Sequence, residues 1–398
     1  MVIGSKESAA YDGCVQTGRG TTMYCFDKIV DRGRDSMSFS MKWQGYQGQY
    51  EGYCIDVDRA IPMWVADMDF PCPREVVAAV TRRAQHGIYG YTSPECTQDF
   101  LAAAADWIGR RQGWDVEAGS MIFSPGIVPA IYAAVQAFTE TGDGIIVQSP
   151  VYYPFMRAAA HNKRQVVSNQ LQRTKSGYEI DFAGLEELAT DKKNRLMILS
   201  NPHNPVGRVW RREELVRILE ICQAHDVVLF SDEIHCDLTY PHVNFTSLGA
   251  ICKPGDPVII AQAPSKTFNL AGLQASALVI PNQTVRQTLS TQYLMNRLPG
   301  SNAFGALAGA VAYRTGEAYL EELLQYLWGN MEYAAKELNQ TEMAWMDLPE
   351  ATYLAWVEFP GQPEHALNRL ILEKAGVIGD IGTWFGPGGS GFMRLNLA

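Results

Sequence analysis

Short apolar runs alternate with polar breaks along the middle of this chain, between about residues 120 and 265. Each run is followed by a break rich in Ser, Pro, Gly or Asn, and most breaks lead into a pattern typical of a helix. This alternation predicts an α/β fold with a mainly parallel sheet. The apolar runs span residues 121–123, 144–148, 196–199, 227–230 and 258–261.

The polar breaks after these runs are the places where a binding site is expected. In open α/β sheets, ligands lie beyond the carboxyl ends of the strands, where several such breaks converge. All the reactive candidates discussed below, apart from one arginine and one tyrosine, fall in or next to these breaks.

Length and periodicity predict two domains. A chain of 398 residues is long for a single core. Helical spacing is clearest over residues 129–139, 212–225 and 317–339, and a strand, a helix and a glycine-rich loop are expected after residue 350. We expect a flexible leader over 1–22, an N-terminal segment over 23–70 that contributes to the small domain, a large domain over 71–298 and a small domain over 299–398.

Composition excludes several classes of function. The formal net charge of −10 opposes binding to DNA or RNA, and no apolar stretch is long enough to span a bilayer. The eight cysteines are scattered, without zinc-type spacing, which predicts reduced thiols, no metal site and a cytoplasmic location.

Lys266 is the strongest reactive candidate, because it follows the last apolar run of the series and can serve as a Schiff-base nucleophile. Pyridoxal phosphate (PLP) needs such an amine, an acid at its ring nitrogen, a donor at its phenolic oxygen, an aromatic face and an anion site. Asp232 could be the acid, Asn204 the donor and Tyr152 the stacking ring. The alternatives are a helix-capping aspartate, a turn asparagine and a packing tyrosine.

An anion site is expected where a helix begins after Ser-Pro-Gly at 124–126. The free backbone N–H groups of Ile127 and Val128 suit a phosphate dianion, and Ser265 could add a hydroxyl. Arg394 lies among apolar residues, which indicates either a clamp on a substrate carboxylate or a structural ion pair. His235, three residues after Asp232, is by itself more typical of a core histidine.

Taken together, these residues resemble fold-type I PLP enzymes of the class I/II aminotransferase superfamily, and within it the MalY/PatB family of cystathionine β-lyases, or C–S lyases. The similarity covers nearly the whole chain, from about residue 26 to 396. It rests on the sequence strings at 64–70, 86–91, 201–210, 231–237, 265–273 and 391–396.

The resemblance implies a role for each candidate. Lys266 would form the Schiff base, Asp232 would meet the ring nitrogen and Asn204 the phenolic oxygen. His235 occupies a position where many relatives have a tyrosine near that oxygen. The resemblance also implies a mainly parallel seven-stranded sheet sandwiched by helices, with a smaller α+β domain. Tyr152 would be the stacking ring, Arg394 the α-carboxylate clamp, and Tyr91 the residue that reaches the phosphate of the neighbouring subunit in a homodimer.

Two departures from the family pattern stand out. Ala263 replaces a phosphate-binding serine of the aminotransferase relatives, so that Ser265 and the helix amides are expected to contribute more. The chain ends four residues after Arg394, where relatives usually continue with a further helical segment. We expect either a truncation or a different cap on the small domain.

The predicted activity is α,β-elimination from cystathionine or a related cysteine S-conjugate, yielding a thiol, pyruvate and ammonia. The alternative within the same fold is an amino-acid aminotransferase, because the two reactions share their first steps. A third hypothesis is a regulatory protein that restrains a transcription activator by protein contact, as one branch of the family does. No residue pattern identifies the preferred thioether.

Overall fold

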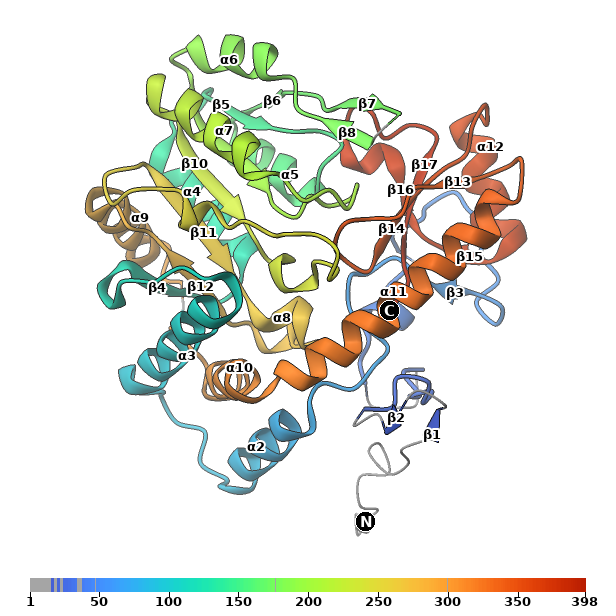
Figure 1. Cartoon of the computed structure of the whole chain (residues 1–398), viewed down its shortest axis with the longest axis horizontal. Helices are drawn as coiled ribbons and strands as arrows, with labels where there is room; N and C mark the ends of the chain where they lie inside the picture. The colour runs from blue at the N-terminus through green and yellow to red at the C-terminus, as the bar shows by residue number, and fades with distance from the viewer. Residues whose placement is uncertain are drawn as a thin grey trace.

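The computed structural model describes residues 16–17, 20–21, 24–33, 38–46, 48–175, 177–298 and 300–398. Its centre is a seven-stranded sheet in the order β4-β12-β11-β10-β9-β5-β6 (Figure 1). Neighbouring strands from β11 to β6 pair in parallel, and β12 alone runs antiparallel to its two neighbours. The prediction of a mainly parallel seven-stranded sheet is therefore confirmed. The strands are β4 (Met121–Ser124), β5 (Gly144–Val147), β6 (Gln165–Ser168), β9 (Asn194–Ser200), β10 (Val228–Asp232), β11 (Val258–Gln262) and β12 (Ser276–Val279).

Helices cover both faces of this sheet, because successive strand residues point to opposite sides. On β9, Leu196 and Ile198 pack with α4 (Ile127–Phe138), α5 (Tyr153–His161) and α9 (Gln283–Met295). The intervening Met197 and Leu199 belong to the apolar cluster on the other face. That cluster includes α3 (Pro94–Gln112), α6 (Phe182–Thr190), α7 (Arg212–Ala224) and α10 (Ala303–Thr315).

A second, four-stranded antiparallel sheet has the order β13-β14-β17-β16. Its strands are β13 (Trp345–Met346), β14 (Leu354–Glu358), β16 (Asp380–Ile381) and β17 (Phe392–Asn396). The long helix α11 (Glu317–Asn339) runs from the large sheet towards this smaller one (Figure 1). Helix α10 packs against α2 (Arg74–Gln85) and α3. The pair formed by α10 and α11 therefore begins beside the large sheet. The domain limits given above stay a prediction.

The remaining elements are short. The leader predicted over residues 1–22 lies outside the described residues except for β1 (Gln16–Thr17) and β2 (Gly20–Thr21), which pair antiparallel. No helix in the described part of the chain is long and apolar enough to cross a membrane. Also present are α1 (Met41–Gln44), β3 (Ile61–Pro62) paired with β15 (Val377–Ile378), the hairpin of β7 (Gln172–Thr174) and β8 (Gly177–Glu179), α8 (Pro264–Thr267), α12 (Glu364–Asn368), the π-helical turn Arg369–Ala375, and 3₁₀ turns at Ala118–Ser120, Cys236–Leu238, Leu248–Ala250, Ala271–Leu273 and Gly382–Phe385.

Two helical glycines provide a matched test of this packing. A Cβ atom at Gly305 in α10 would lie 2.0 Å from the carbonyl oxygen of Leu273, whereas one at Gly329 in α11 would meet no atom within 4 Å. We expect Gly305→Ala to lower the free energy of unfolding by about 1–3 kcal/mol through overpacking. Gly329→Ala should raise it by up to about 1 kcal/mol, because alanine is the better helix former. Urea unfolding of both variants measures the difference, and equal effects would contradict the close packing of α10.

Candidate active site

A cavity of about 260 Å³ lies at the carboxyl ends of the parallel strands. The breaks that follow β4, β9, β10 and β11 all contribute to its wall. Eight of the ten site residues expected from the sequence line this one cavity: Ile127, Val128, Tyr152, Asn204, Asp232, His235, Ser265 and Lys266. Arg394 does not line the cavity itself but contacts Asn204, which does. Tyr91 is fully exposed and lies outside the cavity.

Lys266 enters the cavity from the short helix α8, directly after β11. Its Nζ donates to the backbone oxygen of Ala66 at 2.6 Å. Burial, with a further contribution from the positive charge of Arg394, lowers the pKa of Lys266 to about 8. A larger fraction of this amine is therefore neutral near pH 7 than of an exposed lysine.

Asp232 ends β10, is buried and lines the cavity. One carboxylate oxygen accepts from the backbone N–H of Ile234 at 3.1 Å. Burial raises the pKa of Asp232 to about 7. A buried carboxyl group of this kind is suited to a cationic N–H of a ligand, which would restore its ionised form.

Asn204 is oriented by Arg394. Its Oδ1 accepts from Arg394 Nη1 at 2.9 Å, which leaves the amide Nδ2 to donate into the cavity. The backbone oxygen of Asn204 accepts from Tyr152 N at 3.0 Å, so that the loop after β9 and the start of α5 are held together. Asn204 and Tyr152, the two residues predicted to contact a bound ring, are thus held close to each other by this backbone hydrogen bond.

The predicted anion site forms where α4 begins. Gly126 precedes the helix with φ of 146°, a conformation that favours glycine. The first backbone N–H groups of α4 have no partner within the helix and face the cavity wall at Ile127 and Val128. Ser265 and Ala263 line the same cavity.

His235 is fully buried, and in the described part of the chain its Nδ1 has no hydrogen-bond partner. Burial, followed by the charges of Lys266 and Arg394, lowers the pKa of His235 well below its usual value. The imidazole is therefore neutral, and its ring lies edge-on to Tyr353, with 6.4 Å between centroids. A neutral imidazole with an unused nitrogen at a cavity wall suits a hydrogen bond to a ligand oxygen.

Of the two alternatives that the sequence left open for Arg394, the structure contains the ion pair, and the carboxylate clamp stays a prediction. Arg394 lies on β17 directly opposite Asp380 of β16, and the two side chains form a buried ion pair. Arg394 Nη2 also donates to the backbone oxygen of Trp64 at 3.1 Å. Asp380 escaped the sequence analysis, because nothing in its local sequence indicates that it faces an arginine on another strand.

Residues 64–70 form a strap that reaches the cavity at Ala66 and that the sequence analysis did not assign to the site. Ala66 lines the cavity, and its oxygen accepts from both Lys266 Nζ and Tyr353 Oη, the latter at 2.9 Å. Asn269, three residues after Lys266, donates to the oxygens of Met68 and Phe70 at 2.8 Å each. The strap is therefore fastened to the segment that directly follows α8, the helix that carries Lys266.

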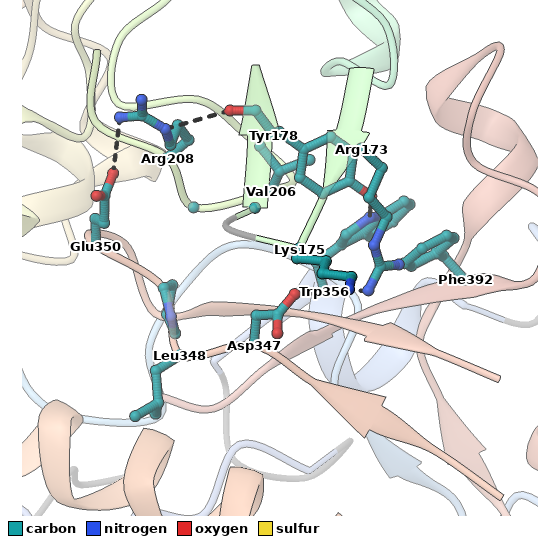
Figure 2. Close-up of a pocket in the computed structure, with 13 residues that line it drawn as sticks. Arg173, Lys175, Tyr178, Val206, Arg208, Asp347, Leu348, Glu350, Trp356 and Phe392 are labelled. Carbon is teal, nitrogen blue, oxygen red and sulfur yellow. Dashed lines mark hydrogen bonds and ion pairs between the residues drawn. The ribbon is translucent and has the colours of Figure 1, made fainter. Parts of the chain in front are cut away.

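A second cavity, of about 310 Å³, lies between the β7–β8 hairpin and the four-stranded sheet (Figure 2). Its two arginines already hold carboxylates. Arg173 pairs with Glu358 at 2.7 Å, and Arg208 pairs with Glu350 at 3.2 Å. Since both arginines are engaged in these ion pairs, this cavity is better suited to joining the two sheets than to chemistry.

Comparison with known proteins agrees with this geometry. Residues 60–398 match the family described as aminotransferase class I and II. The chain belongs to this family. The chain is also similar to solved structures of the same fold: cystalysin from Treponema denticola, whose structure contains pyridoxal 5'-phosphate, superposes with a TM-score of 0.88 at 32% identity, covering 94% of each chain.

Within the aminotransferase class I and II family, the predicted MalY/PatB relationship is confirmed. Cystathionine beta-lyase PatB from Bacillus subtilis is 43% identical over 90% of this chain and 92% of its own length. Protein MalY from Escherichia coli is 28% identical over 94% of both chains. This family member thus matches both proteins over nearly their full length.

The lowered pKa of Lys266 can be measured without turnover. In the cofactor-free protein, acetylation of Lys266 should reach half its maximal rate near pH 8, because the neutral amine reacts and the folded-state pKa is about 8. Arg394→Met removes a nearby positive charge, so the midpoint should move to higher pH. Mass spectrometry of the labelled peptide follows both midpoints. A midpoint near that of ordinary lysines in the unsubstituted protein would contradict the assignment.

Proposed function

We propose that this protein is a PLP-dependent C–S lyase that cleaves cystathionine or a related cysteine S-conjugate. The observation that supports it most directly is the convergence of Lys266, Asp232 and Asn204 on one cavity in a chain 43% identical to a cystathionine beta-lyase. This relative favours elimination over the aminotransferase alternative.

The cavity fits the cofactor by the chemistry of its donors. Asp232 has a raised pKa and would hold a proton on the ring nitrogen. Asn204 Nδ2 and the unused nitrogen of His235 would bind the phenolic oxygen. The remaining contacts are the phosphate with the amides of Ile127 and Val128 and with Ser265, and the ring face with Tyr152.

When bound, PLP supplies an electron sink for the negative charge that develops at the substrate Cα. Lys266 would accept the Cα proton at Nζ, for which its lowered pKa is suited. Arg394 would hold the α-carboxylate, and the strap at 64–70 would keep water from the reacting carbon. The C–S bond then breaks with both electrons on sulfur, and the remaining three-carbon fragment is hydrolysed to pyruvate and ammonia.

The substrate test separates the lyase from the aminotransferase. Holoenzyme incubated with L-cystathionine, without any keto acid, should release pyruvate and a free thiol in equal amounts. Lys266→Ala should lower this rate by at least about 10³-fold and abolish the absorbance of the lysine-linked cofactor. The matched control is Lys192→Ala, at an exposed lysine far from the cavity. Turnover only after addition of a keto acid would favour the aminotransferase instead.

We further propose a homodimer in the cytoplasm, with Tyr91 of one subunit completing the phosphate site of the other. The exposure of Tyr91 and of its neighbours Ile88 and Tyr89 supports a contact at this loop. Lys266→Ala and Tyr91→Ala should each be inactive or nearly so alone. Mixed dimers of the two should regain activity, because one of their two sites has both residues intact. Failure of co-refolded dimers to regain activity would contradict a shared site.

A further inference from the structure

Arg394 Nη2, which lies on both edges that a carboxylate could use, already donates to two acceptors. A carboxylate binds a guanidinium through two parallel N–H groups, either on Nη1 and Nη2 or on Nε and Nη2. Both edges need Nη2, and Nη2 donates to the oxygen of Trp64 and to Asp380 Oδ2. A substrate carboxylate that binds with two hydrogen bonds must therefore displace one of these acceptors.

The two acceptors differ in what their displacement leaves behind. The Trp64 oxygen is neutral, whereas Asp380 is a carboxylate that is almost completely buried. In the described part of the chain, Asp380 Oδ1 has no hydrogen-bond partner, and neither has Arg394 Nε. Once Oδ2 loses Arg394, both oxygens of Asp380 lack a donor. A bare buried carboxylate is unfavourable, and a proton removes its charge.

We propose that Asp380 is a positioning residue that holds the Arg394 guanidinium until the substrate carboxylate displaces it, and that Asp380 takes up one proton on displacement. The ion pair keeps the clamp aligned opposite β16 while the site is empty, and substrate binding replaces one carboxylate by another. The net charge around Arg394 is then unchanged. This inference rests on the proposed function of Arg394 as the α-carboxylate clamp.

The surroundings of Asp380 allow this proton to be identified. The titratable groups that face it are Arg394 from β17, Tyr50 from the N-terminal segment, and Tyr152 and Tyr153 at the start of α5. Burial raises the pKa of all three tyrosines, so they stay protonated near neutral pH. Burial also raises the pKa of Asp380, to about 6, against the opposing effect of Arg394.

The sign of the pH dependence follows from these charges. An anion at Arg394 raises the pKa of Asp380 further, because it removes the stabilising cation and adds a like charge. Binding is then strongest where Asp380 is protonated before the ligand arrives, and weakens as the pH rises above the pKa of the empty site.

The test uses holoenzyme and propionate, a monocarboxylate without an amine, so that the link between Lys266 and the cofactor stays intact. Titration followed by cofactor absorbance should give a Kd that rises about fiftyfold between about pH 6 and 8, because uptake of one proton weakens binding by up to tenfold per pH unit above the empty-site pKa of Asp380. Asp380→Asn should reduce this change to less than about twofold and bind propionate more tightly at the higher pH. Asp347→Asn, at an exposed acid that follows β13 on the opposite edge of the four-stranded sheet from Asp380, is the matched control and should behave like the unsubstituted protein.

Calorimetry and an Arg394→Met variant test the proposal further. Calorimetry of the unsubstituted holoenzyme in two buffers of different ionisation enthalpy should detect uptake of about one proton per propionate near pH 7. No uptake, or the same pH dependence in Asp380→Asn, would overturn the inference, and the calorimetry gives an answer even if that variant does not fold. Arg394→Met should abolish propionate binding. If it binds like the unsubstituted protein, the clamp in the proposed function fails, whereas loss of binding without proton uptake refutes only the part assigned to Asp380.

Discussion

Parallel pairing of β9, β10 and β11 is the constraint on which the site depends. Because the three strands run in the same direction, their carboxyl ends and the loops that follow lie at one edge of the sheet. Asn204, Asp232 and Lys266, up to 62 positions apart in sequence, thereby line one cavity. An antiparallel arrangement would send neighbouring loops to opposite ends, and the three side chains could not meet.

Burial at this edge brings the pKa values of the two central ionisable groups, Lys266 and Asp232, closer together. It lowers the pKa of Lys266 to about 8 and raises that of Asp232 to about 7. Each pKa shift makes the charged form less favourable, in a group that would otherwise be fully ionised at neutral pH. The site therefore has an amine that can be neutral near pH 7 and a carboxyl group whose ionised form a cationic ligand nitrogen would stabilise, which suits the proposed PLP chemistry.

Arg394 joins the two sheets into one functional unit. It belongs to the four-stranded sheet, yet it contacts Asn204 from the large sheet and the strap at Trp64. The strap in turn accepts from Lys266 and is fastened by Asn269. Arg394 and Lys266 thus donate to backbone oxygens only two residues apart on the same segment, at Trp64 and Ala66.

The sequence by itself determined the fold class and most of the cavity wall. Apolar runs that alternate with polar breaks require strands covered on both faces, and the residues just after those strands must gather at one edge. The helix over residues 317–339 was predicted to the residue, because its apolar spacing has clear ends. These features depend on local periodicity, which a single sequence contains.

Only the tertiary structure decided which residues far apart in sequence contact each other. Asp380 faces Arg394 because of the register between β16 and β17, and the Ala66 oxygen meets Lys266 across 200 positions of sequence. Neither contact leaves a local pattern, since register and long-range hydrogen bonds arise from how separate segments pack. The sequence therefore predicted residues that line one cavity, while the tertiary fold determined what holds them in place and shifts their pKa values.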